Sequence, residues 1–163
     1  MTTLTQQVHD EHAHLLPHIE TLRTVADTVG RTTPEELGAA LVDLRRFLTG
    51  HLVPHAEAED RVLYPAVARV MGAAEATATM SREHVEVGRL ARELDTLHEA
   101  MDREGLDDGR QAALRRVLYG LYALLKVHFA KEEEIYLPLL EARLPGPEAE
   151  RLLAELAHAG HHG

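Results

Sequence analysis

The sequence has no cysteine and no tryptophan, and its 163 residues include only four tyrosines and two phenylalanines. The absence of cysteine excludes disulfide bonds, thiol catalysis, iron–sulfur clusters and zinc sites built on thiolates. Because aromatic residues make up only 4% of the chain, the 45% hydrophobic content consists mainly of leucine, alanine and valine. That composition favours helices over a β-sandwich, and the length fits one domain with a sizeable core.

Basic residues are also scarce, since 17 Lys and Arg stand against 27 Asp and Glu, a formal net charge of −10. A field of this sign repels nucleic acids and anionic membranes, so neither is expected as a partner. No apolar run approaches the roughly 20 residues needed to span a bilayer, and the N-terminus shows no export signal. We therefore expect a soluble, cytoplasmic protein.

Apolar residues recur with the period of amphipathic helices through most of the chain. Glycine and proline divide this pattern into four long helices, expected at residues 4–29, 34–71, 79–104 and 108–143. Pro65 and Pro138 fall inside the second and fourth helices, where proline kinks a helix or relaxes its hydrogen bonds. The predicted fold class is all-α: an antiparallel up-down four-helix bundle over residues 1–145, followed by a short fifth helix and tail over residues 146–163.

Two segments of the chain repeat one pattern. Residues 55–65, "HAEAEDRVLYP", and residues 128–138, "HFAKEEEIYLP", each begin with His, carry Glu four residues later and end with Pro. Residues four apart lie one turn apart on the same face of a helix, so each pair can reach a common ion. Duplicated pairs of an imidazole and a carboxylate indicate a metal site.

Polar residues interrupt the apolar stripe of every predicted helix. The stripe of the fourth helix, for example, is expected to bury Leu121, Leu125, Ile135 and Leu139. The interruptions that fall at core positions are His12, His51, His55, Glu59, His84, His128 and Glu132, with His98 at a lower level of the third helix, about 20 Å along the helix from His84. Charged groups are costly in a core unless they are paired or bind something, so these residues are candidate ligands.

The turns place most of these interruptions at one height. His12 and His55 are equidistant from the turn that joins the first two helices, and His84 and His128 from the turn that joins the last two. His84 also matches the His55–Glu59 pair across the middle turn. Antiparallel neighbours that are equidistant from their turn lie level with each other. The predicted metal ligands are therefore His12, His55, Glu59, His84, His128 and Glu132.

Four imidazoles and two carboxylates exceed the ligand set of a single tetrahedral zinc. They suit two ions that prefer octahedral coordination, such as iron or manganese, with external ligands at the remaining positions.

The order His … His-x-x-x-Glu … His … His-x-x-x-Glu on four helices resembles the hemerythrin-like (HHE cation-binding) proteins over about residues 5–143. The resemblance implies a non-haem centre of two iron ions, joined by an oxo or hydroxo bridge, that binds O2, peroxide or nitric oxide. By position, it makes the four histidines terminal ligands and Glu59 and Glu132 the bridging carboxylates.

The chain departs from the oxygen carriers of this family at two positions. The carriers have another histidine one turn after the ligand of the third helix, where this chain has Gly88. They also place the fourth-helix carboxylate five residues after its histidine, which is the position of Glu133 here. We favour Glu132, because it lies on the apolar stripe and Glu133 points about 100° further round the helix. The missing imidazole leaves more room at one ion, which favours reactivity over reversible oxygen carriage.

Several roles stay open at this point. His51 lies one turn before His55 and is expected to face the core, where it could replace the missing ligand, support a ligand or simply be a core histidine. Tyr64 and Tyr136 follow the two repeated motifs and are expected to pack, although a phenol near the site could also become a ligand or quench radicals. No candidate for an organic-substrate pocket is visible. Three functions compete: a redox centre with catalase- or peroxidase-like turnover, an iron or oxygen sensor or iron buffer without turnover, and a bundle without metal.

Overall fold

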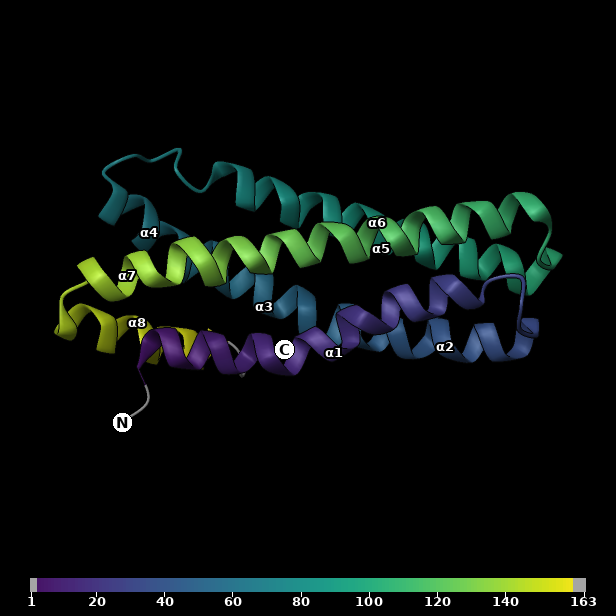
Figure 1. Ribbon diagram of the computed structural model, residues 1–163, viewed down its shortest axis with the longest axis horizontal. Helices are drawn as coiled ribbons and strands as arrows, with labels where there is room; N and C mark the ends of the chain where they lie inside the picture. Colours follow the sequence, from purple (N-terminus) through teal and green to yellow (C-terminus); the bar gives the residue numbers. More distant parts are fainter. Residues whose placement is uncertain (1–2, 160–163) are drawn as a thin grey trace.

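The computed structural model describes residues 3–159, and these residues form only helices and the turns between them. Four long helical segments lie lengthwise beside one another (Figure 1). They are α1 (Leu4–Thr28), the segment from α2 (Pro34–Phe47) through α3 (Val53–Ala58) to α4 (Tyr64–Met71), α5 (Ala78–Glu104), and α6 (Asp108–Lys131) with α7 (Leu137–Arg143). The all-helical class expected from the sequence is confirmed, and the arrangement of the helices is compatible with a bundle.

A fifth helix, α8 (Gly146–Ala159), folds back along the bundle and packs against α1 and the α3–α4 segment (Figure 1). Its buried side chains are Leu152 and Leu156. Residues 160–163 of the predicted tail lie outside the described residues. Over residues 3–159, no helix combines the length and the apolar character needed to cross a membrane.

The ends of the helices follow from local chemistry. Thr33 and Glu36 form a capping box at the start of α2, in which each side chain accepts a hydrogen bond from the backbone N–H of the other residue. Pro34 occupies the first turn, where no N–H is needed. Gly72 ends α4 in the left-handed conformation, with φ of 69°, which residues with a Cβ rarely adopt. These signals place the turns where the sequence predicted them.

Three π-helical turns, each with one residue more than an α-helical turn, interrupt the second and fourth segments: η1 (Leu48–Leu52), η2 (Glu59–Leu63) and η3 (Glu132–Tyr136). Each is followed two residues later by a proline, namely Pro54, Pro65 and Pro138. Proline cannot donate to the carbonyl four residues earlier, so the preceding turn is free to widen. The relaxed hydrogen bonding expected near Pro65 is therefore present.

The π turn η3 changes which residues of the fourth segment are buried. The sequence pattern predicted that Ile135 and Leu139 are buried, but Ile135 is 54% exposed and Leu139 is only partly buried. Tyr136, Leu137 and Leu140 fill the core instead. The prediction was wrong because it continued a 3.6-residue period through a turn that contains an extra residue, which rotates the later residues about the helix axis.

The buried apolar residues form two clusters with a polar layer between them. On α1, for example, Val8 belongs to one cluster, Leu15 belongs to the other, and the buried His12 lies between them. On the fourth segment, Leu125 of α6 and Tyr136 of η3 flank His128 and Glu132 in the same way. The candidate ligands thus interrupt the core at a single level.

Candidate metal centre

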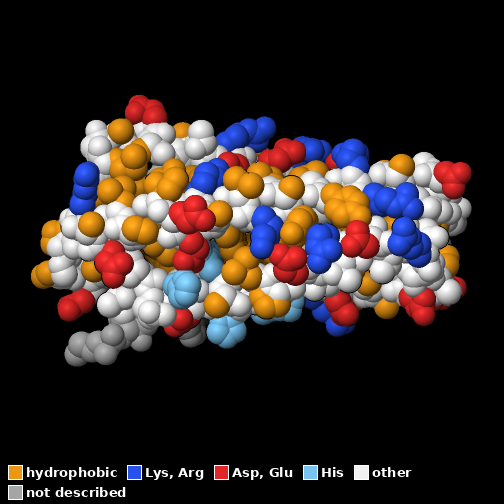
Figure 2. Space-filling view, in the orientation of Figure 1, with side chains coloured by type: hydrophobic (Ala, Val, Ile, Leu, Met, Phe, Trp, Pro, Cys, Tyr) orange, Lys and Arg blue, Asp and Glu red, His pale blue; other side chains and the backbone are white. Residues whose placement is uncertain are grey.

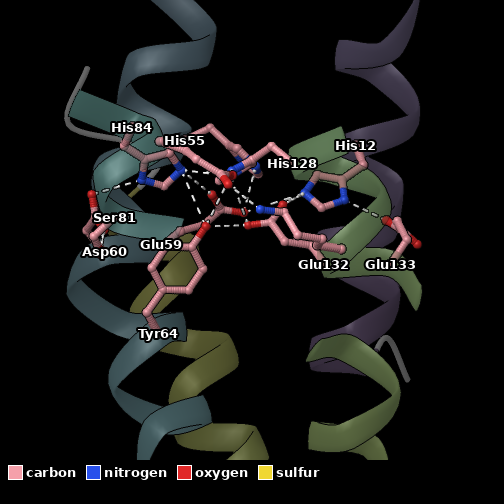
Figure 3. Close-up of polar contacts among 12 residues, drawn as sticks. His12, His55, Glu59, Asp60, Tyr64, Ser81, His84, His128, Glu132 and Glu133 are labelled. Atoms are coloured by element: carbon pink, nitrogen blue, oxygen red, sulfur yellow. Dashed lines mark hydrogen bonds and ion pairs between the residues drawn. The ribbon is translucent and has the colours of Figure 1, made fainter. Parts of the chain in front are cut away.

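The six predicted ligands converge in the middle of the bundle (Figure 3). They come from all four segments: His12 from α1, His55 from α3, Glu59 from the first residue of η2, His84 from α5, His128 from α6 and Glu132 from the first residue of η3. Four of them, His12, Glu59, His128 and Glu132, are at most 2% exposed. Both carboxylates thus stand where a π turn begins, and such turns are frequent at functional sites.

The ligand atoms form two overlapping groups. His12 and His55 gather with Glu59 and Glu132, and His84 and His128 gather with the same two glutamates. Within each group, one ligand atom per residue lies within 4.8 Å of all the others. Two histidines per group and two carboxylates common to both groups make an arrangement that can hold metal ions.

Several atoms at the centre are buried and have no hydrogen-bond partner within residues 3–159: Nε2 of His12 and His55, both carboxylate oxygens of Glu59, and Oε2 of Glu132. Nε2 of His55 is only 2.9 Å from Oε1 of Glu59, an ion-pair distance, but the angles do not make a hydrogen bond. Buried polar atoms without partners are costly. Because these lone pairs point toward a common interior space instead of toward donors, the donor set fits bound cations.

A second layer of carboxylates surrounds the histidines. The Nδ1 atom of each ring contacts an acidic side chain: Glu133 at 2.5 Å from His12, Glu11 at 3.1 Å from His55, Asp60 at 2.9 Å from His84, and Glu83 at 2.7 Å from His128. A carboxylate can only accept, so Nδ1 carries the proton and donates it. Nε2 then faces the centre, and the carboxylate makes the imidazole a stronger ligand.

Opposing charges set the protonation of the inner groups. Burial alone would lower the pKa of His12, but the carboxylates of Glu132 and Glu59, which lie 3.3 and 3.5 Å from Nε2, outweigh it and raise the pKa to about 9. Burial would also lower the pKa of His55. The charge of Glu59 and the hydrogen bond with Glu11 outweigh this effect and raise the pKa to about 10. Burial would raise the pKa of Glu59, but the charge of His55 and the nearby imidazoles of His12 and His84 hold it well below its usual value. Without metal, therefore, protons on the imidazoles balance the carboxylates.

Tyr64 is part of the centre, whereas the sequence favoured a packing role for it and left a role near the metal open. Its hydroxyl donates to Oε1 of Glu132 at 2.5 Å and lies 3.1 Å from Nε2 of His128 (Figure 3). Burial and the charges of Glu59 and Glu132 raise the pKa of the phenol, so it remains a donor. The signal in the sequence was its position five residues after Glu59. In the structure it follows directly after the π turn that Glu59 begins. Tyr136, by contrast, packs in an apolar cluster, and within residues 3–159 its hydroxyl hydrogen-bonds the carbonyl of Ala76, at 3.4 Å.

The structure separates the remaining candidates. Glu132 lies in the centre, whereas Glu133 lies behind His12 (Figure 3). The expectation that His51 faces the core was wrong, because the π turn η1 places it on the surface, and it belongs to neither ligand group. Gly88 leaves space at the position of the extra histidine, since a Cβ there would meet only the guanidinium of Arg92, at 3.4 Å.

A cavity of about 220 Å³ lies beside Gly88 and reaches His55, Glu59, His84 and His128. Its walls are mainly apolar, and Leu52, Val53, Val85, Val87, Leu125 and Phe129 form them. The sequence showed no pocket of this kind, because its wall residues come from elements that are far apart in the chain. The cavity thus joins an apolar wall to four of the six candidate ligands.

The hemerythrin HHE cation binding domain matches residues 3–159, which is nearly the whole chain. The chain belongs to this family. Neither the curated proteins nor the solved structures include a match to the chain. Family membership and the two groups of ligand atoms together identify a cation-binding module of the hemerythrin type.

Proposed function

We propose that this hemerythrin-family chain is a non-haem di-iron protein that binds O2, peroxide or nitric oxide and decomposes hydrogen peroxide. The observation that carries the proposal is the sharing of Glu59 and Glu132 between two ligand groups. Two carboxylates common to two pairs of imidazoles are what two neighbouring octahedral ions require. The proposal includes the antiparallel up-down order of the four segments, which puts the ligands of neighbouring segments at one level.

Iron is the proposed metal because the donors are imidazole nitrogens and carboxylate oxygens, without thiolates. Bound iron would supply Lewis acidity and exchange electrons with the small ligand. The chain contributes the rest: the outer carboxylates hold each Nε2 toward the centre, Tyr64 fixes Glu132, and the cavity beside Gly88 leaves space for the ligand. In the proposed reaction two molecules of hydrogen peroxide yield two of water and one of O2, so no external reductant is needed.

The test is the metal content and absorption spectrum of protein purified without a histidine-affinity step after growth with added iron. We expect about two iron ions per chain, an absorption band that changes on addition of peroxide, and release of O2. The variant Glu59→Ala, which lacks one shared carboxylate, should hold less iron and release less O2. Less than one metal ion per chain in the unaltered protein would overturn the proposal.

A second candidate is a sensor or iron buffer without turnover. It is favoured by α8, which packs against η2, the turn that begins at the ligand Glu59. A change at the centre would thus reach a surface helix directly. Hydrogen exchange of α8 with and without iron distinguishes the two candidates, because only the sensor requires the protection of α8 to depend on the metal.

A further inference from the structure

A second cavity, of about 270 Å³, reaches the centre between α1, α3 and α8. It has the ligands His55 and Glu59 in common with the apolar cavity, but Glu11, His14 and His51 also line it. We propose that this opening is the route by which a divalent cation enters the centre, and that His14 and His51 bind the cation first. The inference rests on the proposed function only in requiring that the centre binds cations.

The two histidines are free to bind a metal. Nδ1 of His14 donates to the carbonyl of Asp10 at 2.7 Å, since a carbonyl can only accept. The lone pair of His14 is therefore on Nε2, which makes no hydrogen bond within residues 3–159. His51 is exposed and has no hydrogen-bond or ion-pair partner in the same part of the chain. Figure 2 shows histidine side chains gathered on the surface over the N-terminal half of α1.

Further polar groups line the cavity between the exposed His14 and His51 and the centre. Glu11 is half-exposed and accepts a hydrogen bond from Nδ1 of the ligand His55. Deeper in the cavity lies Glu59, which is 2% exposed and whose two carboxylate oxygens lack hydrogen bonds. A hydrated cation can thus exchange water for imidazole and carboxylate donors in steps, which lowers the cost of desolvation. The net charge of −10 attracts cations to the whole surface.

The apolar cavity beside Gly88 is less suited to the entry of a divalent cation. Apart from the ligands, its acidic residues are Glu57 and Asp60, and Asp60 bonds a ligand histidine just as Glu11 does, so the carboxylates do not distinguish the two cavities. Its histidines are all ligands of the centre, and its walls are mainly aliphatic. We assign the cation to the opening lined by His14 and His51, and the small uncharged ligand to the apolar cavity. The π turn η1 makes this division possible, because it takes His51 out of the core and places it beside the opening.

Two glycines provide matched variants, because Gly50 lines the polar cavity and Gly88 lines the apolar one. A Cβ at Gly50 would meet no atom within 4 Å, and one at Gly88 would meet only the end of the Arg92 side chain. Gly50→Leu and Gly88→Leu should therefore each fold and narrow one cavity. The double variant His14→Ala/His51→Ala changes only exposed residues and removes the proposed first ligands.

The experiment follows uptake of Co2+ by the metal-free protein in stopped flow, at one mildly alkaline pH, through the absorption of the bound ion. We expect His14→Ala/His51→Ala and Gly50→Leu to slow uptake by about tenfold or more, without changing the amount bound at equilibrium. Gly88→Leu should take up Co2+ at the unaltered rate.

Uptake at the unaltered rate in the double variant, or slower uptake in Gly88→Leu alone, would overturn the route. Should Gly50→Leu fail to fold, as circular dichroism would reveal, the double variant still decides the question. Failure of the unaltered chain to bind Co2+ at all would instead refute the cation centre, so the two proposals fail in different ways.

Discussion

Glu132 and Glu133 lie on opposite sides of the His12 ring. Oε2 of Glu132 is 3.3 Å from Nε2, and Oε1 of Glu133 is 2.5 Å from Nδ1. Glu132 is fully buried, whereas the side chain of Glu133 is 27% exposed. Consecutive residues of the chain thus occupy the inner and outer layers of the centre, and His12 connects them.

This relationship predicts unequal effects of two conservative substitutions. Glu132→Gln removes a carboxylate from both ligand groups and should abolish binding of at least one ion per chain. Glu133→Gln keeps every inner ligand and only weakens the hydrogen bond that orients the ring of His12. It should therefore lower metal affinity by about 10- to 100-fold. Titration of the metal-free variants with Co2+ measures both effects. A larger loss in Glu133→Gln than in Glu132→Gln would show that Glu133, not Glu132, supplies the carboxylate of the fourth segment.

The raised pKa values of His12 and His55 predict how the stability of the metal-free protein depends on pH. Against the effect of burial, the neighbouring carboxylates raise these pKa values to about 9 and about 10 from an ordinary value of 6.5. A raised histidine pKa stabilises the fold fully below pH 6.5, and this stability is lost as the pH rises through 9 to 10. The Tm of the metal-free protein should therefore fall over this interval.

The Tm of the cation-loaded protein should instead rise as the pH increases over the same interval. Metal binding requires imidazoles without a proton on Nε2, so metal affinity increases as the pH rises. Calorimetric scans of both forms at the same series of pH values test this prediction. Parallel curves for the two forms would contradict the view that protons and metal ions compete for His12 and His55.

Tyr64→Phe should destabilise the metal-free protein by about 1–3 kcal/mol, because it removes a hydrogen-bond donor from the buried Glu132. Tyr136→Phe is the matched control, since the hydroxyl of Tyr136 makes one long bond, of 3.4 Å, to a carbonyl. Its effect should be below about 1 kcal/mol. Urea unfolding of both variants provides the comparison. Similar losses of unfolding free energy in the two variants would show that the hydroxyl of Tyr64 does not stabilise Glu132.

The π turn η3 predicts a contrast between two neighbouring aliphatic residues. Ile135→Ala should change the free energy of unfolding by no more than about 0.5 kcal/mol, because Ile135 is exposed. Leu137→Ala should cost about 2–5 kcal/mol, because Leu137 is 4% exposed and packs in the core. An uninterrupted α-helix would bury Ile135, so a large loss at that position in urea unfolding would contradict the π turn.

Much of the fold was predictable because it depends on signals within short stretches of chain. The capping box at Thr33 and the glycine at position 72 place turns, and the distances along the chain from those turns set the height of each candidate ligand. The His–Glu pairs follow from spacing on a single helix. Burial of Ile135 and an inward position for His51 were wrong, since both extended a regular period across a π turn.

By itself, the sequence determined the helices, the level of the polar layer and the six side chains that meet there, because periodicity and spacing are properties of chain order. Only the tertiary structure decided that Tyr64 contacts Glu132, that each ligand histidine has a carboxylate behind it, and that two cavities of different character reach the centre. These features depend on how far each helix is rotated about its axis and on which distant residues it then faces. One extra residue in a turn changes that rotation without changing the amphipathic pattern of the residues that precede the turn.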